Sequence, residues 1–323
     1  MSTIREVAAC AGVSLSTVSI VINGQAAVRK ITPETCQKVW DAVRELDYKP
    51  NIAARKLRHA GANDVITIAL FWANDFRTTM LSRFLQGMQR QLSRQRSFMD
   101  GRRFHAAIVA NASEEDLAFL EENEFPFPVI LYNRESERYS CVTVDEAEMG
   151  QKAAAELLLR GHHNICILTS PGGYSYMRER DEGVQTAFQQ AGYPIYSDRI
   201  LLTESSLAGG AAACRRALDA MIPCTAFYCA SDAIALGALR VLHDRGIRVP
   251  EQISLISIGN GEPAFAAYSI PALSNIYLPM EEMAEKCLEL ARKSVGTHDL
   301  APMHIRLETK VYLRESLGEA PVR

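Results

Sequence analysis

The sequence predicts a small all-α head of about 50 residues followed by a larger α/β body. Three observations predict this division. Helical spacing of apolar residues fills the first 46 positions, β-rich hydrophobic runs alternate with helical ones from residue 64 onward, and basic residues are concentrated in the first 60 positions. With 323 residues, 48% of them hydrophobic, the chain is long enough to bury two cores.

The composition excludes a membrane-spanning protein and a disulfide-stabilised secreted domain. No apolar run reaches the roughly 18 residues that a membrane span needs, and the first 20 residues lack a charged segment followed by a hydrophobic block. We therefore expect a cytoplasmic protein. The eight cysteines form no CxxC pair and mostly lie in apolar runs, so we expect reduced, buried thiols, no metal site and no cofactor.

Two short helices joined by a glycine turn open the head. Thr3 and Glu6 have the spacing of a capping box, and the apolar residues that follow share one helix face: Ile4, Val7, Ala8 and Ala11. Gly12 ends this helix. Ser14 then caps a second helix that ends at Asn23-Gly24 and whose apolar stripe comprises Val18, Val21 and Ile22.

A third helix completes a small shared core. Thr32-Pro33-Glu34 supplies a cap, a proline at the first helical position and an acid in the first turn. The expected buried face of this helix comprises Val39, Trp40, Val43 and Leu46.

The second helix exposes small hydroxyls and follows a tight turn, as the recognition helix of a helix-turn-helix does. The first helix would lie across the phosphates and the second would enter the major groove, where hydroxyls donate without filling it. The candidate DNA contacts in the head are Thr3, Ser14, Leu15, Ser16, Thr17, Ser19, Ile20 and Asn23. A helical bundle that docks on the body or on another protein is the alternative.

Charge favours DNA as the partner of the head. Residues 1–60 contain nine Lys and Arg and five Asp and Glu, which gives a net charge of +4. Since the formal charge of the whole chain is −3, the remaining residues carry a net charge of −7. A basic head on an acidic body indicates a polyanionic partner. After the head, Asn51 caps a helix of barely two turns, IAARKLRHA, which is too short to be stable alone in water.

The stretches TIREVAACAGVSLSTVSIVING and TPETCQKVWDAVRELDYKPNIAARKLR resemble the DNA-binding head and hinge of the lactose-repressor (LacI) family of bacterial regulators. The resemblance implies a helix-turn-helix domain at 1–50, a hinge helix and linker at 51–61, and hinge contacts to DNA by Asn51, Ala54 and Leu57. Leu57 matches the leucine that paired hinge helices insert into the minor groove, where an apolar wedge kinks the duplex; a plain linker residue is the alternative.

Ile20 departs from the family pattern. Family members often carry Arg or His there, whereas this helix presents Leu15, Ser16 and Ile20 toward the groove and has no bidentate purine reader. We hypothesise that Leu15 and Ile20 contact thymine methyls, that Ser16 supplies the polar readout, and that hinge insertion contributes much of the specificity.

The body is predicted to be doubly wound α/β. Strand candidates are 65–71, 104–110, 128–133, 164–170, 199–203, 225–230 and 253–259. Helices between them end at glycines, namely Gly161, Gly192 and Gly246.

Most of residues 125–316 also resemble the effector domain of the same family, which is similar in fold to periplasmic sugar-binding proteins. The resemblance implies a two-lobed, periplasmic-binding-protein-like (type I) effector-binding and dimerisation domain at 62–318. The first lobe would span about 62–160 and 277–302, and the second about 161–276 and 303–318.

Ligand chemistry is expected where strand ends face the cleft between the lobes. Arg180 matches the effector-binding arginine of the family, whose planar fork holds two oxygens of a sugar or carboxylate. The candidate effector contacts are Asn74, Phe76, Asn133, Asp145, Arg180, Ser231 and Asp232. Two departures indicate an unusual effector: Gly261 stands where relatives usually carry an aspartate, and Ser205 stands where they often place an aromatic ring.

We expect the first lobe to lack one βα unit. Only a short segment, 95–104, separates the helix expected at 79–95 from the strand at 104–110, where relatives have a further strand and helix. The loss would leave the strand at 65–71 at the edge of the sheet.

These features together predict a ligand-responsive transcription regulator, expected to be a repressor of catabolic genes. Its partners would be a pseudo-palindromic double-stranded operator, a small-molecule effector such as a sugar, and a second copy in a homodimer; no leucine heptads support a tetramer. The alternative is a small-molecule-binding protein without DNA function. We expect no enzyme, because the chain lacks the nucleotide-binding glycine patterns and a GxSxG elbow.

Overall fold

The computed structural model describes residues 4–22, 31–46, 68–72, 81, 83–85, 87–88, 105–110, 112–125, 127–171, 175–295 and 301–321. The chain divides into two compact units, a head at Met1–Asp64 and a body at Val65–Arg323.

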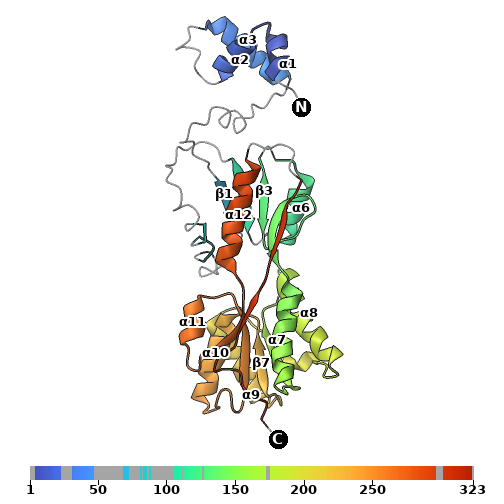
Figure 1. Ribbon diagram of the computed structural model, residues 1–323, viewed down its shortest axis with the longest axis vertical. Helices are drawn as coiled ribbons and strands as arrows, with labels where there is room; N and C mark the ends of the chain where they lie inside the picture. The colour runs from blue at the N-terminus through green and yellow to red at the C-terminus, as the bar shows by residue number, and fades with distance from the viewer. Residues whose placement is uncertain are drawn as a thin grey trace. The chain divides into compact units, whose positions relative to one another are not determined.

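The described head consists of three helices around one apolar core (Figure 1). They are α1 (Ile4–Ala11), α2 (Leu15–Ile22) and α3 (Pro33–Glu45). Its core is formed by Val7, Ala8, Val18, Val21, Val39 and Ala42, all of them buried. The turn between α1 and α2 is made at Gly12, whose φ of 65° is costly for a residue with a Cβ.

The caps of α2 and α3 are those that the sequence predicts, whereas Thr3, the predicted cap of α1, lies outside the described residues. The Ser14 hydroxyl accepts a hydrogen bond from the Thr17 backbone N–H at 3.1 Å, and Thr32 caps α3 by accepting from Thr35. The prediction for Trp40 is wrong: its side chain is 41% exposed. Val39 and Ala42 already face the core, and a residue next to Val39 points about 100° away around the helix.

The first sheet of the body is parallel throughout its described strands. In spatial order these are β1 (Ile68–Trp72), β2 (Ala106–Ala110), β3 (Val129–Tyr132), β4 (Ser140–Val144) and β10 (His304–Leu307). One face packs against Phe84 and α12 (Met280–Ser294), and the other against α6 (Glu114–Glu122) (Figure 1). Side chains of each strand alternate between the two faces, so both faces are apolar.

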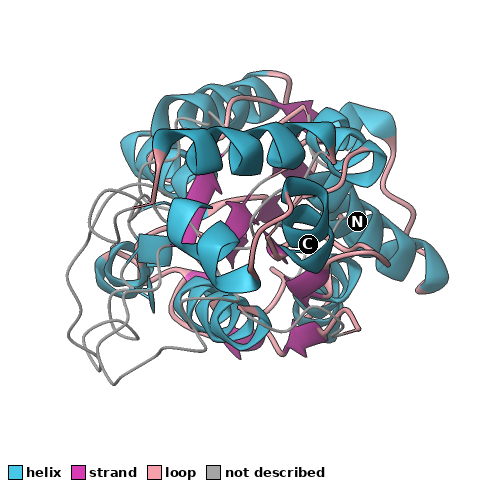
Figure 2. Ribbon diagram, turned by 90° about the horizontal axis from the view of Figure 1, so that it is seen from above, coloured by secondary structure: helices cyan, strands magenta, loops and turns pink. Residues whose placement is uncertain are grey.

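The second sheet is parallel except for one edge strand. In spatial order its strands are β11 (Lys310–Tyr312), β9 (Ser274–Tyr277), β8 (Ser254–Gly259), β7 (Ala226–Cys229), β5 (Ile165–Thr169) and β6 (Ile200–Leu202). Its helices are α7 (Glu146–Leu159), α8 (Ser175–Gln190), α9 (Leu207–Asp219), α10 (Asp232–Asp244) and α11 (Pro263–Tyr268), with a 3-10 turn at Ser197–Arg199. Figure 2 shows helices on both sides of the body's strands, as the hydrophobic strand runs predict.

The glycine stops predicted for the body are confirmed. Gly161, Gly192 and Gly246 follow α7, α8 and α10 directly or within two residues, each with positive φ. Four strands lie outside the predicted runs: β4, β9, β10 and β11. The last two alternate exposed and half-buried residues, and β9 carries buried polar side chains, so none of these three is a continuous apolar run.

The lobe limits differ from the predicted ones at two elements. α7 packs against α8, β8 and β9 and therefore belongs to the second lobe, although the predicted limit at residue 160 assigns it to the first. β10 pairs with β4 and therefore belongs to the first lobe, although the predicted range 303–318 assigns it to the second. The chain crosses between the lobes after β4, after β9 and after β10.

β1 forms an edge among the described strands of the first sheet, where it pairs with β2. This position is the one expected if a βα unit is missing. The short segment 95–104, on which that expectation is based, lies outside the described residues. Within the described residues, no helix has the length and apolar character that crossing a bilayer demands.

Candidate functional site

The exposed side of α2 carries the residues predicted to read DNA. Leu15 is 45% exposed and Ser16 is exposed, whereas Ser19 and Ile20 are half-buried. Val18 and Val21 anchor the opposite side of the helix in the core. A slim helix held from behind in this way presents small side chains outward, which is what entry into a major groove requires.

The hydroxyls of Ser14 and Thr17 already make hydrogen bonds within the head. Their hydroxyls lie 2.9 Å apart, and Ser14 caps α2. The other DNA-contact candidates, Thr3, Asn23, Asn51, Ala54 and Leu57, lie outside the described residues, as do the effector candidates Asn74 and Phe76.

In the body, the predicted effector residues Asn133 and Arg180 both contact Glu146, which is not among the predicted site residues. Asn133, which follows β3 with a positive φ, donates from Nδ2 to Oε1 of Glu146 at 2.7 Å. Arg180 of α8 donates from Nη2 to the same oxygen at 2.9 Å and from Nε to Oε2. The side chains of Arg180 and Glu146 are only 2% and 5% exposed.

This ion pair changes what Arg180 offers a ligand. Burial would lower the pKa of Arg180, but Glu146 raises it above its ordinary value, so the guanidinium stays charged. Because the Arg180 guanidinium donates to both carboxylate oxygens of Glu146, a ligand here would contact an ion pair with no net charge. Glu146 could have been predicted as a site residue because it directly follows Asp145 at the carboxyl end of β4. Its pairing with Arg180, 34 positions along the chain, could not be predicted from the sequence.

Polar atoms without partners surround this pair. Among the described residues, the hydroxyls of Tyr132 and Tyr228 and Oδ1 of Asp181 are buried and make no hydrogen bond. Buried polar atoms are almost always satisfied, so these mark a place for a ligand or water. Burial raises the pKa of Asp181 to about 6, against the opposing hydrogen bond that Oδ2 accepts from Thr169 at 2.6 Å.

Asp145 and Ser231, by contrast, are N-cap residues of helices. Asp145 caps α7 by accepting from the Glu148 backbone N–H at 2.8 Å and pairs with Arg306 at 3.2 Å. Ser231 caps α10 by accepting from the Ile234 N–H, and it also accepts from the Ser205 hydroxyl at 3.1 Å. Both lie at strand ends as predicted, with their oxygens committed to these bonds.

Asp232 lies on the opposite face of the second sheet from Arg180. Strand register aligns Cys229, Ser257, Asn275 and Tyr312 on one face of this sheet. Asp232 accepts from the Ser257 hydroxyl at 2.5 Å and from the Asn275 amide at 3.3 Å, so it sits on that face. Tyr228 is one residue out of phase with Cys229 and therefore points to the other face, toward Arg180 and Asp181.

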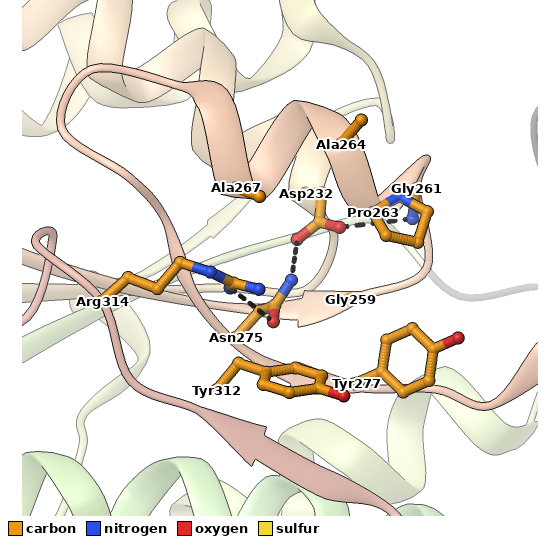
Figure 3. A pocket seen from close by; sticks show the side chains of 10 residues that line it. All are labelled: Asp232, Gly259, Gly261, Pro263, Ala264, Ala267, Asn275, Tyr277, Tyr312 and Arg314. Atoms are coloured by element: carbon orange, nitrogen blue, oxygen red, sulfur yellow. Dashed lines mark hydrogen bonds between the residues drawn. The ribbon is translucent and has the colours of Figure 1, made fainter.

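A cavity of about 330 Å³ adjoins Asp232 between α11 and the edge of the second sheet (Figure 3). Its lining residues are Asp232, Gly259, Gly261, Pro263, Ala264, Ala267, Asn275, Tyr277, Tyr312 and Arg314. Burial raises the pKa of Asp232 even though Ser257, Asn275 and the Gly261 N–H donate to it.

A buried arginine of the first lobe, Arg83, donates hydrogen bonds to residues at the edge of this cavity. Arg83 donates to both oxygens of Glu281 at 2.8 and 2.9 Å, to the Gly261 carbonyl at 2.8 Å and to the Leu278 carbonyl at 2.9 Å. A longer bond of 3.4 Å reaches the Gly259 carbonyl. Arg83 therefore connects the first lobe to residues 259–261 of the second, and no pattern in the sequence indicates this contact.

Comparison with known proteins identifies both units. Residues 3–51 match the family model described as bacterial regulatory proteins, lacI family, and residues 154–317 match that of a periplasmic binding protein-like domain. The HTH-type transcriptional regulator AscG of Escherichia coli is 31% identical, with 89% of this chain and 90% of AscG covered. DegA of Bacillus subtilis is 28% identical, with 98% of both chains covered.

Solved structures agree with the sequence relatives. A LacI family transcription regulator from Clostridium acetobutylicum is 29% identical, with a TM-score of 0.73 over 77% of this chain and 100% of that one. The transcriptional regulator CelR in complex with cellobiose is 26% identical, with a TM-score of 0.69 over 98% of this chain and 100% of that one. The chain thus belongs to the lacI family of bacterial regulatory proteins, which are ligand-responsive, DNA-binding transcriptional regulators.

Proposed function

We propose that this regulator is a homodimeric repressor of catabolic genes, acting in the cytoplasm on a pseudo-palindromic operator. A small metabolite bound between the lobes, at the polar cluster around Asn133 and Arg180, would change its affinity for that operator. The observation that carries this proposal is the presence, on one chain, of a lacI-type head and a two-lobed body with unsatisfied buried polar atoms between its sheets.

On the DNA side, Leu15, Ser16 and Ile20 would read the major groove, and Leu57 would enter the minor groove at the operator centre. The exposure of Leu15 beside the small Ser16 supports contacts to thymine methyls, since an apolar side chain on a groove-facing helix otherwise gains nothing in water. Two heads are needed to read two half-sites, which links the operator proposal to the dimer.

The surface of α11 supports a homodimer. Phe265, Tyr268 and Ile270 are 60, 85 and 94% exposed, and they follow one another along the same short segment. Exposed large apolar side chains close together along one segment are typical of a protein contact. A second copy of the chain is the partner that the family favours.

On the ligand side, a metabolite acts only by binding one lobe arrangement better than another, typically with about 1–3 kcal/mol of coupling. The three chain crossings permit such a rearrangement, and Tyr132, Tyr228 and Asp181 offer the polar atoms that a ligand would satisfy. The solved relative with bound cellobiose supports a small polar effector of the sugar type.

The decisive experiment is a binding selection from random duplex DNA with the full-length protein, followed by affinity measurements over a salt series. We expect the selection to yield a pseudo-palindromic site. The logarithm of the association constant for this site should fall with the logarithm of the salt concentration, with a slope of roughly −0.9 for each phosphate neutralised. Leu57→Gly should weaken operator binding. Arg180→Ala leaves the buried Glu146 unpaired and should lower the Tm of the body, but the folded variant should still bind the operator and should lose the ligand response.

A protein without duplex affinity at low salt would instead be a small-molecule-binding protein that lacks DNA function. A selected half-site defined by guanines under α2 would refute the thymine-methyl readout. An unchanged response of Arg180→Ala at the same ligand concentration would refute the effector site.

A further inference from the structure

The cavity under α11 is a second polar site, separate from the cluster around Arg180. Strand register places the two on opposite faces of the second sheet. Pro263, Ala264 and Ala267 of α11 form an apolar roof, and the rings of Tyr277 and Tyr312, 5.6 Å apart and nearly perpendicular, form an aromatic wall. A volume of about 330 Å³ is enough for one small metabolite.

A negative and a positive side chain face this cavity in fixed positions. Figure 3 shows Asp232, Asn275 and Arg314 in one hydrogen-bonded row. The Asn275 amide donates to Oδ1 of Asp232 at 3.3 Å and accepts from Nη1 of Arg314 at 3.2 Å. The carboxylate and the guanidinium are therefore held one amide group apart, with equal and opposite charges.

Both charged groups keep capacity for a ligand. Nη1 of Arg314 is bound to the Leu273 carbonyl at 2.6 Å as well as to Asn275; in the described part of the chain, Nε and Nη2 make no hydrogen bond. Oδ2 of Asp232 accepts only a long bond of 3.3 Å from the Gly261 N–H within the described residues. Burial raises the pKa of Asp232, so its present donors do not fully offset the desolvation of the carboxylate.

Glycine at position 261 keeps the approach to Asp232 open. A Cβ built at Gly261 would lie 3.4 Å from Oδ2 and 3.3 Å from the Cβ of Asp232. Any side chain there would cover the carboxylate from the cavity side. Asp232 is only 2% exposed, and glycine at position 261 leaves its Oδ2 facing the cavity without a side chain in between.

We propose that this cavity binds a free α-amino acid. Its ammonium group donates to Asp232, its carboxylate accepts from Arg314, and its apolar or aromatic side chain lies between the two tyrosines and the roof of α11. An α-amino acid carries the two opposite charges on adjacent groups, which matches a carboxylate and a guanidinium separated by one amide.

Other ligand classes match less of the lining. A simple carboxylate or phosphate satisfies Arg314 but is repelled by Asp232, and a simple amine has the reverse problem. A neutral sugar leaves both charges without a charged partner.

The rim of the cavity also offers a route to the other lobe. Arg83 of the first lobe holds the carbonyl of Gly261, whose N–H donates to Asp232. An amino acid that draws Asp232 toward the cavity would act on the same loop that Arg83 holds. The backbone of Gly261 therefore links Asp232 of this site to Arg83 of the first lobe.

The test is a thermal-shift screen of the full-length protein against each protein amino acid in turn at millimolar concentration, followed by calorimetric titration of those that raise Tm. We expect at least one with an apolar or aromatic side chain to bind. Its analogues lacking the amino or the carboxyl group should bind roughly 10- to 100-fold more weakly, as expected for loss of a charge-assisted hydrogen bond.

Variants locate the site. Asp232→Asn and Arg314→Gln should each weaken binding by a similar factor, and Gly261→Ala should weaken it with both charges retained, because its methyl group covers Oδ2. Asp219→Asn, the same substitution at an exposed ion pair of the same lobe, is the control and should bind normally.

Failure of every amino acid to shift Tm would overturn the proposal. So would a bound amino acid that keeps its affinity after removal of its ammonium group, which is measured on the unaltered protein and does not depend on variants folding. The assay contains no DNA, so this failure would leave the proposed operator binding untouched, and loss of operator binding would leave this site untouched.

Discussion

Replacing Arg83 by alanine tests how much the buried Arg83–Glu281 ion pair contributes to the stability of the body. The Arg83 side chain is fully buried and that of Glu281 is 10% exposed. The substitution removes both hydrogen bonds to the Glu281 carboxylate and those to the carbonyls of Leu278 and Gly261. A carboxylate would then remain in a low-dielectric site with only the Tyr277 hydroxyl, 3.1 Å away, as a described side-chain donor.

Breaking a buried ion pair from one side typically destabilises a protein by about 3–5 kcal/mol. For a body of this size we expect the Tm of its unfolding transition to fall by roughly 2–4 °C per kcal/mol, hence by roughly 6–20 °C. Truncating Arg83 and Glu281 together should cost less than the sum of the single changes, because the double variant leaves no unpaired charge.

The assay is differential scanning calorimetry of the full-length protein, with the body transition followed separately from that of the head. Arg306→Ala is the matched control: Arg306 also bridges two carboxylates, Glu135 and Asp145, but its side chain is 58% exposed, so the expected loss is about 1 kcal/mol or less. Equal losses for Arg83→Ala and Arg306→Ala, or additive effects of the Arg83 and Glu281 changes, would refute the reasoning.

Two further predictions concern other parts of the chain. Because the folded-state pKa of Asp181, about 6, lies above its ordinary value of 3.8, the native state binds more protons than the unfolded one between these values, and stability falls as pH rises through this window. The free energy of unfolding of Asp181→Asn, measured with denaturant, should lack this fall. Relative to that of the unaltered protein, it should rise by up to about 3 kcal/mol between roughly pH 4 and pH 7. Parallel pH profiles of the two proteins would contradict a raised pKa of the buried carboxyl group. In the head, Val39→Ala removes two fully buried methyl groups and should destabilise the head by about 2 kcal/mol, while exposed Lys38→Ala changes little. Calorimetry should then show a lower head transition and an unchanged body transition, and a shift of both together would show that the units do not unfold independently.

Short-range patterns in the sequence predicted those elements whose causes are local. Gly12, Gly161, Gly192 and Gly246 stop helices because a left-handed residue is needed at each stop. Ser14 and Thr32 cap helices because their oxygens reach an N–H three residues on. The strands that pattern reasoning missed include β10 and β11, whose alternating exposure carries little hydrophobic signal.

The sequence by itself determined that a helical, basic head precedes an α/β body, and which residue types stand at the strand ends. Only the tertiary structure decided what those residues face. It paired Arg180 with Glu146, placed Asp232 on the other side of the sheet, and brought Arg83 to Glu281 across nearly two hundred positions of the chain. The reason is physical: a buried charge must find its partner wherever packing brings one within about 3 Å, and that neighbour is fixed by how layers stack, not by spacing along the chain.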